Sequence, residues 1–160
     1  MNQLKIEAAF DVFANENDLN KEDLHLLQSA KVALNNAYAP YSKFLVGAAI
    51  LLENDVIVTG NNQENAAYPS GMCAERVAAF HASSLYPNIK FKTIAISVKS
   101  ENRCIDIPVS PCGACRQSLL EYEVKFNYPI RLIMSGEKGE VYISKSIVNL
   151  LPIAFNINNL

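Results

Sequence analysis

The first residues of the chain alternate between apolar and polar side chains, and a helical pattern follows them. Every second residue is apolar at Leu4, Ile6, Ala8, Phe10 and Val12. This period of two predicts a strand. From Leu24 to Ala37 apolar residues instead recur three or four positions apart, and Asn20 can cap a helix there. We therefore expect an N-terminal extension over residues 1–18, with a strand, ahead of a main domain over residues 19–160.

The rest of the chain alternates between apolar runs of strand length and helical segments. Strands are predicted at residues 46–52, 56–61, 93–98, 130–134 and 141–143. Helices are predicted at residues 73–84 and 111–122, and Ser144 can cap a short last helix that ends before Pro152. Helices that alternate with buried strands are typical of a sheet covered on both faces. We therefore predict an α/β fold of three layers, αβα, with a mixed five-stranded sheet and an extra N-terminal strand.

Length and composition narrow the class of protein. The chain has 160 residues, and 50% of them are hydrophobic, which suits one domain with a sizeable core. Its formal net charge is -2 and no basic stretch stands out, so nothing favours nucleic-acid binding. No apolar run approaches the ~20 residues that span a membrane, and Lys5 and Glu7 interrupt any signal-peptide core. We expect a cytoplasmic protein with a small, nearly neutral substrate and with no nucleic-acid or membrane partner.

The cysteines are the main candidates for chemistry, because structural disulfides are rare in a reducing compartment. Cys112 and Cys115 lie three positions apart at the start of a predicted helix, so their sulfurs can share a metal ion. Ser110 is suited to cap that helix, and Pro111 is suited to its first position. A helix N-terminus favours thiolate over thiol. This spacing alone also fits a redox pair, a structural zinc site or chance.

Cys73 is the best candidate for a third ligand, since it also stands at the start of a predicted helix. His81 lies about two helical turns further on, too far to share a metal with Cys73, and we interpret Cys104 as an incidental loop residue. Three protein ligands leave one tetrahedral zinc position open for water, as in catalytic sites. Glu75 could reach that water. Residues two positions apart in a regular helix point about 200° apart, however, so Cys73 must precede the regular turns.

The segments around these residues resemble the signature of the small, homotetrameric, zinc-dependent cytidine deaminases. The resemblance rests on residues 73–76, Cys-Ala-Glu-Arg, and on residues 111–116, Pro-Cys-Gly-Ala-Cys-Arg. Further matching segments lie, in the family's order, at residues 41–44, 46–49, 62–66 and 150–152. The resemblance covers residues 22–155 and leaves the first 14 residues outside it.

The resemblance implies a metal centre and a proton carrier. The implied cofactor is Zn²⁺, held by Cys73, Cys112 and Cys115. Glu75 matches the glutamate that moves protons in this family. Arg76 could hydrogen-bond a thiolate and offset the negative charge that three thiolates place around the metal.

The resemblance also implies a nucleoside site shared between subunits. Phe44 matches an aromatic residue that packs on the pyrimidine, and the backbone of Ala74 should meet the pyrimidine O2 atom. Asn62 and Glu64 match the pair that holds the ribose 3′-hydroxyl. Contacts with a neighbouring subunit of a homotetramer are implied for Ala66, Tyr68 and Phe155.

The implied reaction is the hydrolytic deamination of cytidine, deoxycytidine or both, a step of pyrimidine salvage. A water activated by zinc attacks C4 of the ring, and ammonia leaves. Two alternatives fit many of the same residues. One is a deaminase of another aminated nucleoside or of a nucleoside antibiotic. The other is a non-catalytic zinc-binding module, which requires a fourth protein ligand in the position that catalysis leaves open.

Overall fold

Six strands form one mixed sheet, in the order β1-β6-β5-β4-β2-β3, in the computed structural model, which describes residues 1–160. The strands are β1 (Asp11–Phe13), β2 (Phe44–Leu52), β3 (Ile57–Asn61), β4 (Phe91–Ser100), β5 (Arg131–Ser135) and β6 (Val141–Ser144). The α-helices are α1 (Lys21–Leu34), α2 (Ala74–Leu85) and α3 (Gly113–Phe126). Short 3-10 helices lie at Glu16–Asp18, Tyr68–Ser70, Ile147–Leu150 and Ile157–Asn159. Only β4 and β5 pair in parallel, and the other neighbouring strands are antiparallel.

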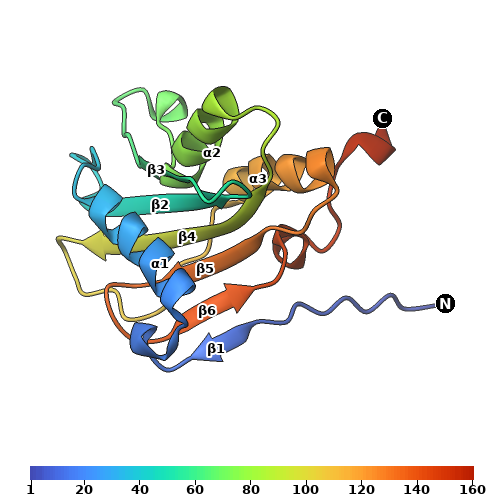
Figure 1. Cartoon of the computed structure of the whole chain (residues 1–160), viewed down its shortest axis with the longest axis horizontal. Helices are drawn as coiled ribbons and strands as arrows, with labels where there is room; N and C mark the ends of the chain where they lie inside the picture. Colours follow the sequence, from blue (N-terminus) through green and yellow to red (C-terminus); the bar gives the residue numbers. More distant parts are fainter.

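The central strands bury both of their faces, which explains why they appear in the sequence as continuous apolar runs. In β2, Ala49 and Leu51 belong to a hydrophobic cluster that packs with α1. The alternate residues Ala48, Ile50 and Leu52 belong to a larger cluster that packs with α2 and α3. Figure 1 shows α1 on one face of the sheet and the other two helices on the opposite face. The predicted three-layer αβα fold is therefore confirmed, with six strands in total.

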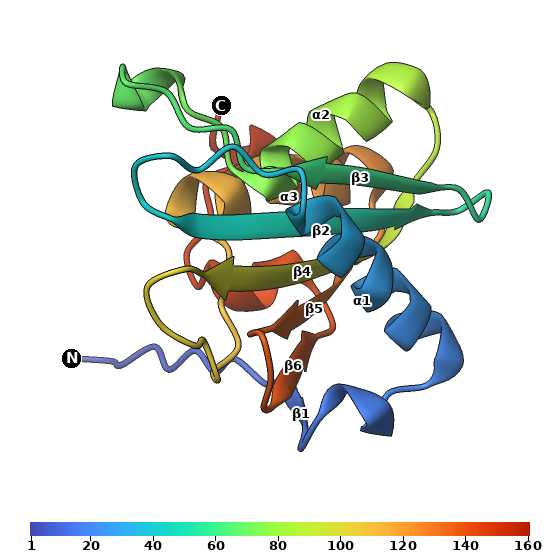
Figure 2. The same ribbon diagram turned by 90° about the vertical axis from the view of Figure 1, so that its left-hand side faces the viewer.

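The predicted N-terminal strand is present but shorter than its sequence pattern. The alternation begins at Leu4, yet only Asp11–Phe13 pairs, in antiparallel register with β6. β6 ends at Ser144, which would lie opposite Phe10, and the chain then turns into a 3-10 helix, so β6 has no residues left to pair with the segment before Phe10. Residues 1–9 are exposed and run away from the body of the molecule (Figure 1 and Figure 2).

The predicted last helix is a 3-10 helix, Ile147–Leu150, and its cap is Ser146 rather than Ser144. The Ser146 side chain accepts a hydrogen bond from a backbone N–H of the first turn. The buried Glu123 carboxylate on α3 also accepts hydrogen bonds here, from the Ser146 hydroxyl and from the first N–H of the helix. These bonds fasten the last segment of the chain to α3.

Gly60 on β3 lets α2 approach the sheet closely. A Cβ atom added to Gly60 would lie 2.4 Å from the Ala78 nitrogen and 2.7 Å from the Ala74 carbonyl oxygen. Both alanines are fully buried, so neighbouring side chains hold the helix where it is. Any side chain at Gly60 would push the first turns of α2 away from the sheet.

We expect Gly60→Ala to lower the free energy of unfolding by about 2 kcal/mol or more, because backbone rather than a side chain must move. Gly113→Ala is a matched control, since a Cβ atom there meets nothing within 4 Å. Chemical denaturation of both variants measures the difference. Equal free energies of unfolding would contradict the close approach.

Candidate metal centre

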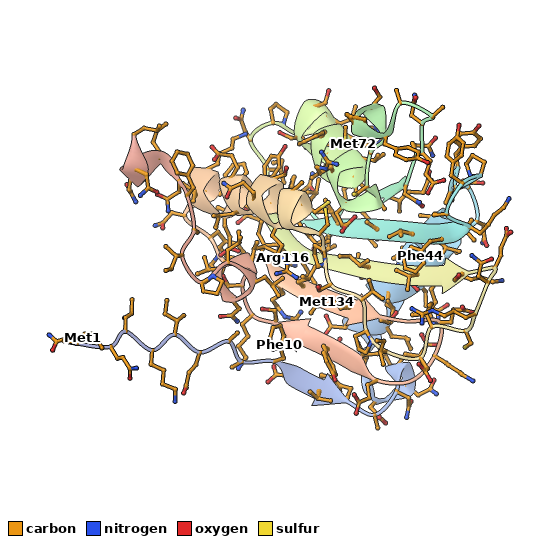
Figure 3. All side chains as sticks on the ribbon, turned by 180° about the vertical axis from the view of Figure 1, so that it is seen from behind. Met1, Phe10, Phe44, Met72, Arg116 and Met134 are labelled. Carbon is orange, nitrogen blue, oxygen red and sulfur yellow. The ribbon has the colours of Figure 1, made fainter.

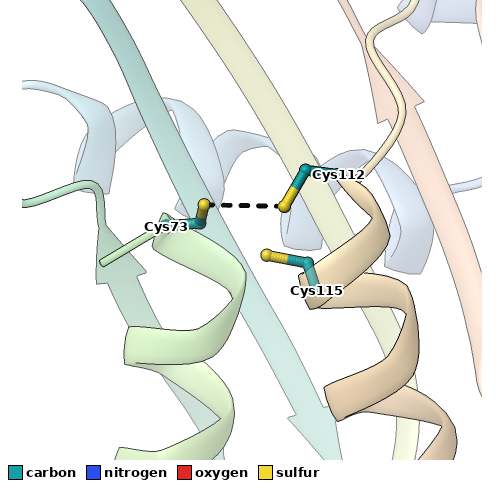
Figure 4. Close-up of side chains that lie close together, drawn as sticks. All are labelled: Cys73, Cys112 and Cys115. Atoms are coloured by element: carbon teal, nitrogen blue, oxygen red, sulfur yellow. Dashed lines mark hydrogen bonds between the residues drawn. The ribbon is translucent and has the colours of Figure 1, made fainter. Parts of the chain in front are cut away.

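Two helix N-termini meet on one face of the sheet, and a cysteine stands at each. Cys73 is the N-cap of α2, and Cys112 is the N-cap of α3. Helix α3 therefore begins later than the predicted start at Pro111, and Ser110 is not its cap. Cys115 lies in the first turn of α3, where the side chain of an N-cap residue also points. Figure 4 shows the Cys115 sulfur directed toward the other two.

The three sulfurs have the spacing of a tetrahedral metal site. The Sγ atoms of Cys73 and Cys112 are 3.8 Å apart, and all three Sγ atoms lie within 4.8 Å of one another. Zinc–sulfur bonds of about 2.3 Å in tetrahedral geometry place two sulfurs about 3.8 Å apart. A disulfide would need a separation of about 2.05 Å. The three cysteines therefore fit Zn²⁺, which is one of the metal ions that thiolate ligands select.

No fourth protein ligand completes this group. No other Cys, His, Asp or Glu joins the three cysteines, and both His81 and Cys104 lie outside the group. A third sulfur is more than a simple redox pair needs. Three ligands with one open position are the arrangement of catalytic zinc rather than of structural zinc.

Hydrogen bonding among the sulfurs makes one of them acidic. A hydrogen bond from the Cys115 thiol, with others from Arg76 and Cys112, lowers the pKa of Cys73 to about 5. The same hydrogen bond to Cys73, together with burial, raises the pKa of Cys115. The cluster thus gives up its first proton more readily than an isolated thiol does, and it resists the loss of a further proton. A divalent cation replaces such protons, since it binds all three sulfurs as thiolates.

Arg76 brings positive charge to the sulfurs. Its Nη2 atom donates to the Cys73 sulfur across 3.8 Å, and this bond raises the pKa of the guanidinium group. Its Nε atom is buried without a hydrogen-bond partner. Leaving a buried donor without a partner costs free energy. The unpaired Nε–H group therefore suits a neighbouring centre that carries more negative charge than neutral thiols do. Three thiolates around Zn²⁺ are such a centre, with a formal charge of about -1.

Glu75 is buried in the first turn of α2, two residues after Cys73. It is 5% exposed, and burial raises the pKa of its carboxyl group. Cys73 has extended backbone, with φ -73° and ψ 151°, and so precedes the regular turns of the helix. The angle of about 200° between side chains two positions apart in a regular helix therefore does not apply to Cys73 and Glu75. Glu75 and Cys73 line the same cavity.

A cavity of about 790 Å³ adjoins the sulfurs, a volume that suits a small molecule. It brings together eight of the residues predicted from the sequence: Phe44, Asn62, Glu64, Tyr68, Cys73, Glu75, Arg76 and Cys112. Apolar strand residues complete one wall, among them Val46, Ile96 and Val98. An apolar wall with a few fixed polar groups is typical of sites for small organic ligands.

The Asn62 side chain extends the hairpin of β2 and β3. Its Oδ1 atom accepts a hydrogen bond from the Val46 N–H at 2.8 Å, and its Nδ2 atom donates to the Phe44 carbonyl oxygen at 2.9 Å. Asn62 thereby fixes the backbone of Phe44, the aromatic residue predicted to contact the ligand. The amide keeps one N–H and one lone pair for a ligand.

The Glu64 carboxylate holds the loop before β2. It accepts hydrogen bonds from the backbone N–H groups of Tyr41, at 2.9 Å, and Ser42, at 3.3 Å. Slight burial acts in the opposite direction, but these bonds and one from the Ser42 hydroxyl lower the pKa of Glu64. Glu64 therefore faces the cavity as a carboxylate at neutral pH.

Four predicted residues do not line this cavity, namely Ala66, Ala74, Cys115 and Phe155, and Tyr68 lies at its rim. Ala74 is fully buried, and no hydrogen bond within the chain uses its backbone N–H. Ala66 and Phe155 are outside the cavity wall. Tyr68 is 77% exposed at the rim, where its ring meets that of Tyr41 edge-on at 6.2 Å between centroids. The exposed rings of Tyr68 and Phe155 are open to contact with another subunit.

Val109 and Ser110 also line the cavity, although no motif singled them out for this role. Arg116 holds their segment in place through three hydrogen bonds. Its Nε atom donates to the Pro111 carbonyl oxygen, and its Nη2 atom donates to the Ser110 hydroxyl, each at 2.8 Å. Its Nη1 atom reaches the Leu150 carbonyl oxygen at 3.2 Å. In the sequence, the one available signal for this segment was Arg116, at the end of the cysteine motif, because a guanidinium group can donate hydrogen bonds to several acceptors.

Known protein sequences match most of this chain. The family model of the cytidine and deoxycytidylate deaminase zinc-binding region matches residues 20–128, which include the three cysteines. A cytidine deaminase from Sporosarcina psychrophila is 40% identical over 136 residues, which cover 84% of this chain and 92% of that protein. A cytidine deaminase from Halalkalibacterium halodurans is 36% identical over 135 residues, which cover 84% of this chain and 95% of that protein.

Solved structures share the fold. The crystal structure of cytidine deaminase from Burkholderia pseudomallei aligns with a TM-score of 0.71 and 35% identity, covering 86% of this chain and 100% of that one. The cytidine deaminase from Mycobacterium tuberculosis aligns with a TM-score of 0.63 and 30% identity, covering 83% of this chain and 96% of that one. Sequence, fold and the three-sulfur centre agree that the chain belongs to the cytidine and deoxycytidylate deaminase family of zinc-binding proteins.

Proposed function

We propose that this protein is a zinc-dependent deaminase that hydrolyses cytidine, deoxycytidine or both to the corresponding uridine. Water replaces the amino group on C4 of the pyrimidine, so that each water consumed releases one ammonia. One observation carries the proposal. The three-cysteine group has an open fourth position, and the buried Glu75 lines the adjoining cavity of about 790 Å³.

Zinc held by Cys73, Cys112 and Cys115 would supply a water of lowered pKa as the nucleophile. Glu75 would take a proton from this water and pass it to N3 of the pyrimidine, while the water oxygen bonds to C4. Glu75 would then move the remaining proton of that oxygen to the amino group, and the C4–N bond would break to release ammonia. The burial of Glu75 supports this role, because the proton path is then shielded from bulk solvent.

The cavity supports a nucleoside as the ligand. We assign Phe44 to the face of the pyrimidine, and the free backbone N–H of Ala74 to its O2 atom. Asn62 and Glu64 would hold the ribose 3′-hydroxyl. Each has polar atoms to spare after its contacts with the protein backbone, and each is fixed by those contacts.

We also propose a cytoplasmic homotetramer whose catalytic unit is residues 19–160. All four cysteines are free, which suits a reducing compartment. None of the helices combines the length and the apolar character that crossing a bilayer requires. The exposed side chains of Tyr68 and Phe155, and the exposed Ala66, would meet neighbouring subunits. Mass measurement in solution tests the tetramer.

We expect the zinc-loaded protein to release ammonia from cytidine or deoxycytidine, and removal of zinc by a chelator to abolish this activity. Zinc analysis, ammonia detection and the ultraviolet change of the cytosine ring measure both effects. A panel of other aminated nucleosides tests the alternative substrates. Full zinc occupancy without ammonia release from any of them would instead support a non-catalytic zinc module.

Glu75→Gln should lower kcat by about 100-fold or more, since the amide cannot carry protons. Zinc content should stay unchanged, because Glu75 is not one of the three ligands. Glu121→Gln, an exposed position on α3, is the control and should leave kcat unaltered. A fully active, zinc-loaded Glu75→Gln protein would refute the proton-carrying role.

Glu64→Gln should raise KM for the nucleoside about tenfold, because a hydrogen bond to a charged acceptor becomes a neutral one. The amide oxygen still accepts from Tyr41 and Ser42, so the loop should keep its place. Zinc content and kcat should change little. Glu53→Gln, on the exposed hairpin turn, is the control. An unchanged KM in the Glu64 variant would remove this carboxylate from the binding site.

A further inference from the structure

Residues 1–10 form an extended arm with few contacts to its own chain. No hydrogen bond joins residues 1–8 to the rest of the chain, and Leu4 and Ile6 are 81% and 47% exposed. Figure 3 shows Met1 far from the body of the molecule, whereas Phe10 lies against it. The arm precedes residues 20–128, which match the deaminase family model, so the catalytic site does not account for it.

The strand into which the arm leads has one unpaired edge. β6 lies along one edge of β1, and no strand lies along the other. On the β6 side, the Ala9 carbonyl oxygen accepts a hydrogen bond from Asn149. Successive residues of a strand turn their N–H and C=O groups to alternate edges, so Ala8, Phe10 and Val12 present theirs to the free edge. Such an edge is a template for pairing with another chain.

We propose that this arm pairs with the free β1 edge of a second copy of the chain, antiparallel, about a twofold axis at Ala8. Each copy then adds a strand to the sheet of the other. Leu4 lies opposite Val12 of the second copy, and Ile6 lies opposite Phe10, so every apolar residue of the alternation meets an apolar partner. Phe10 already packs against the larger core cluster, and the pairing extends that apolar surface outward.

Charge selects this register over its neighbours. With the axis at Ala8, Lys5 lies opposite Asp11 of the second copy, which forms two symmetric ion pairs. An axis at Glu7 would place the Glu7 carboxylates of the two copies opposite each other, where they repel. An axis at Ile6 would leave Phe10 without an apolar partner. An axis between two residues would set apolar side chains against polar ones.

Disulfide trapping in the full-length, zinc-loaded protein tests the register, with Cys104→Ser as the background. Ala8→Cys places two thiols on the proposed axis, within the reach of a disulfide. Ile6→Cys is the matched control, since its two copies would lie about 13 Å apart along the strands. We expect a reducible dimer from Ala8→Cys and at least about fivefold less from Ile6→Cys. Equal yields, no dimer from Ala8→Cys, or a dimer from Ile6→Cys alone would overturn the proposal.

Charge reversal in the Ala8→Cys background tests the pairing itself. Lys5→Asp or Asp11→Lys alone creates two like-charge pairs and should lower the dimer yield about tenfold. The two reversals together restore opposite charges and should restore the yield. Asp11 also lies 4.0 Å from Lys145 of its own chain, and Lys5→Asp does not restore that ion pair when Asp11→Lys has removed it. A dimer yield that recovers in the double variant therefore reflects the contact between the two copies. A double variant no better than the single ones would overturn the proposal.

Zinc content and thermal unfolding verify that each of these variants is folded. Neither measurement should change, because each substituted residue is exposed and none of them lines the cavity. The dimer yield therefore tests the arm separately from the deaminase activity.

Discussion

In this chain three sulfur atoms come within reach of one ion because the first turns of two helices meet, and the site depends on this meeting. Cys73 and Cys112 are both N-caps with extended backbone, so each side chain lies at the end of its helix rather than on its flank. The positive ends of both helix dipoles then face the same sulfurs. With Arg76, they offset the charge of three thiolates that would otherwise weaken the metal as an acid. The same geometry places Glu75 in the wall of the adjoining cavity without making it a member of the three-cysteine group.

This meeting is set by packing rather than by the cysteines themselves. Helix α2 reaches its position because Gly60 leaves space for backbone to lie directly on β3. At the start of α3, Arg116 binds the segment that leads to Cys112 and also a carbonyl oxygen near the end of the chain. Parts of the chain with no role in the chemistry thus hold the sulfurs of Cys73 and Cys112 3.8 Å apart. A site of this kind is rigid because its supports are buried or multiply hydrogen-bonded.

Most of the fold could be predicted because local patterns and burial agree. The apolar runs became strands covered on both faces, and Asn20 caps α1 as expected, by accepting from the Asp23 N–H. Errors at helix starts have a common cause, which is that the expected cap is bonded elsewhere. The Ser110 hydroxyl accepts from Arg116, and the Ser144 hydroxyl donates to the Ser146 carbonyl oxygen. Such contacts depend on tertiary structure, so a motif cannot reveal them.

The cysteine spacing and the family resemblance were sufficient to name the residues that the cavity brings together, but not their second roles. Asn62 and Glu64 bind backbone groups 16 to 23 residues earlier in the chain, and only the fold shows this. The N-terminal pattern is the converse case. Alternation predicts a strand, yet a strand exists only with a partner, and β6 ends before the pattern does. The first residues of the alternating pattern thus have no strand partner within one chain. A second copy with the same pattern is the partner that we propose for them.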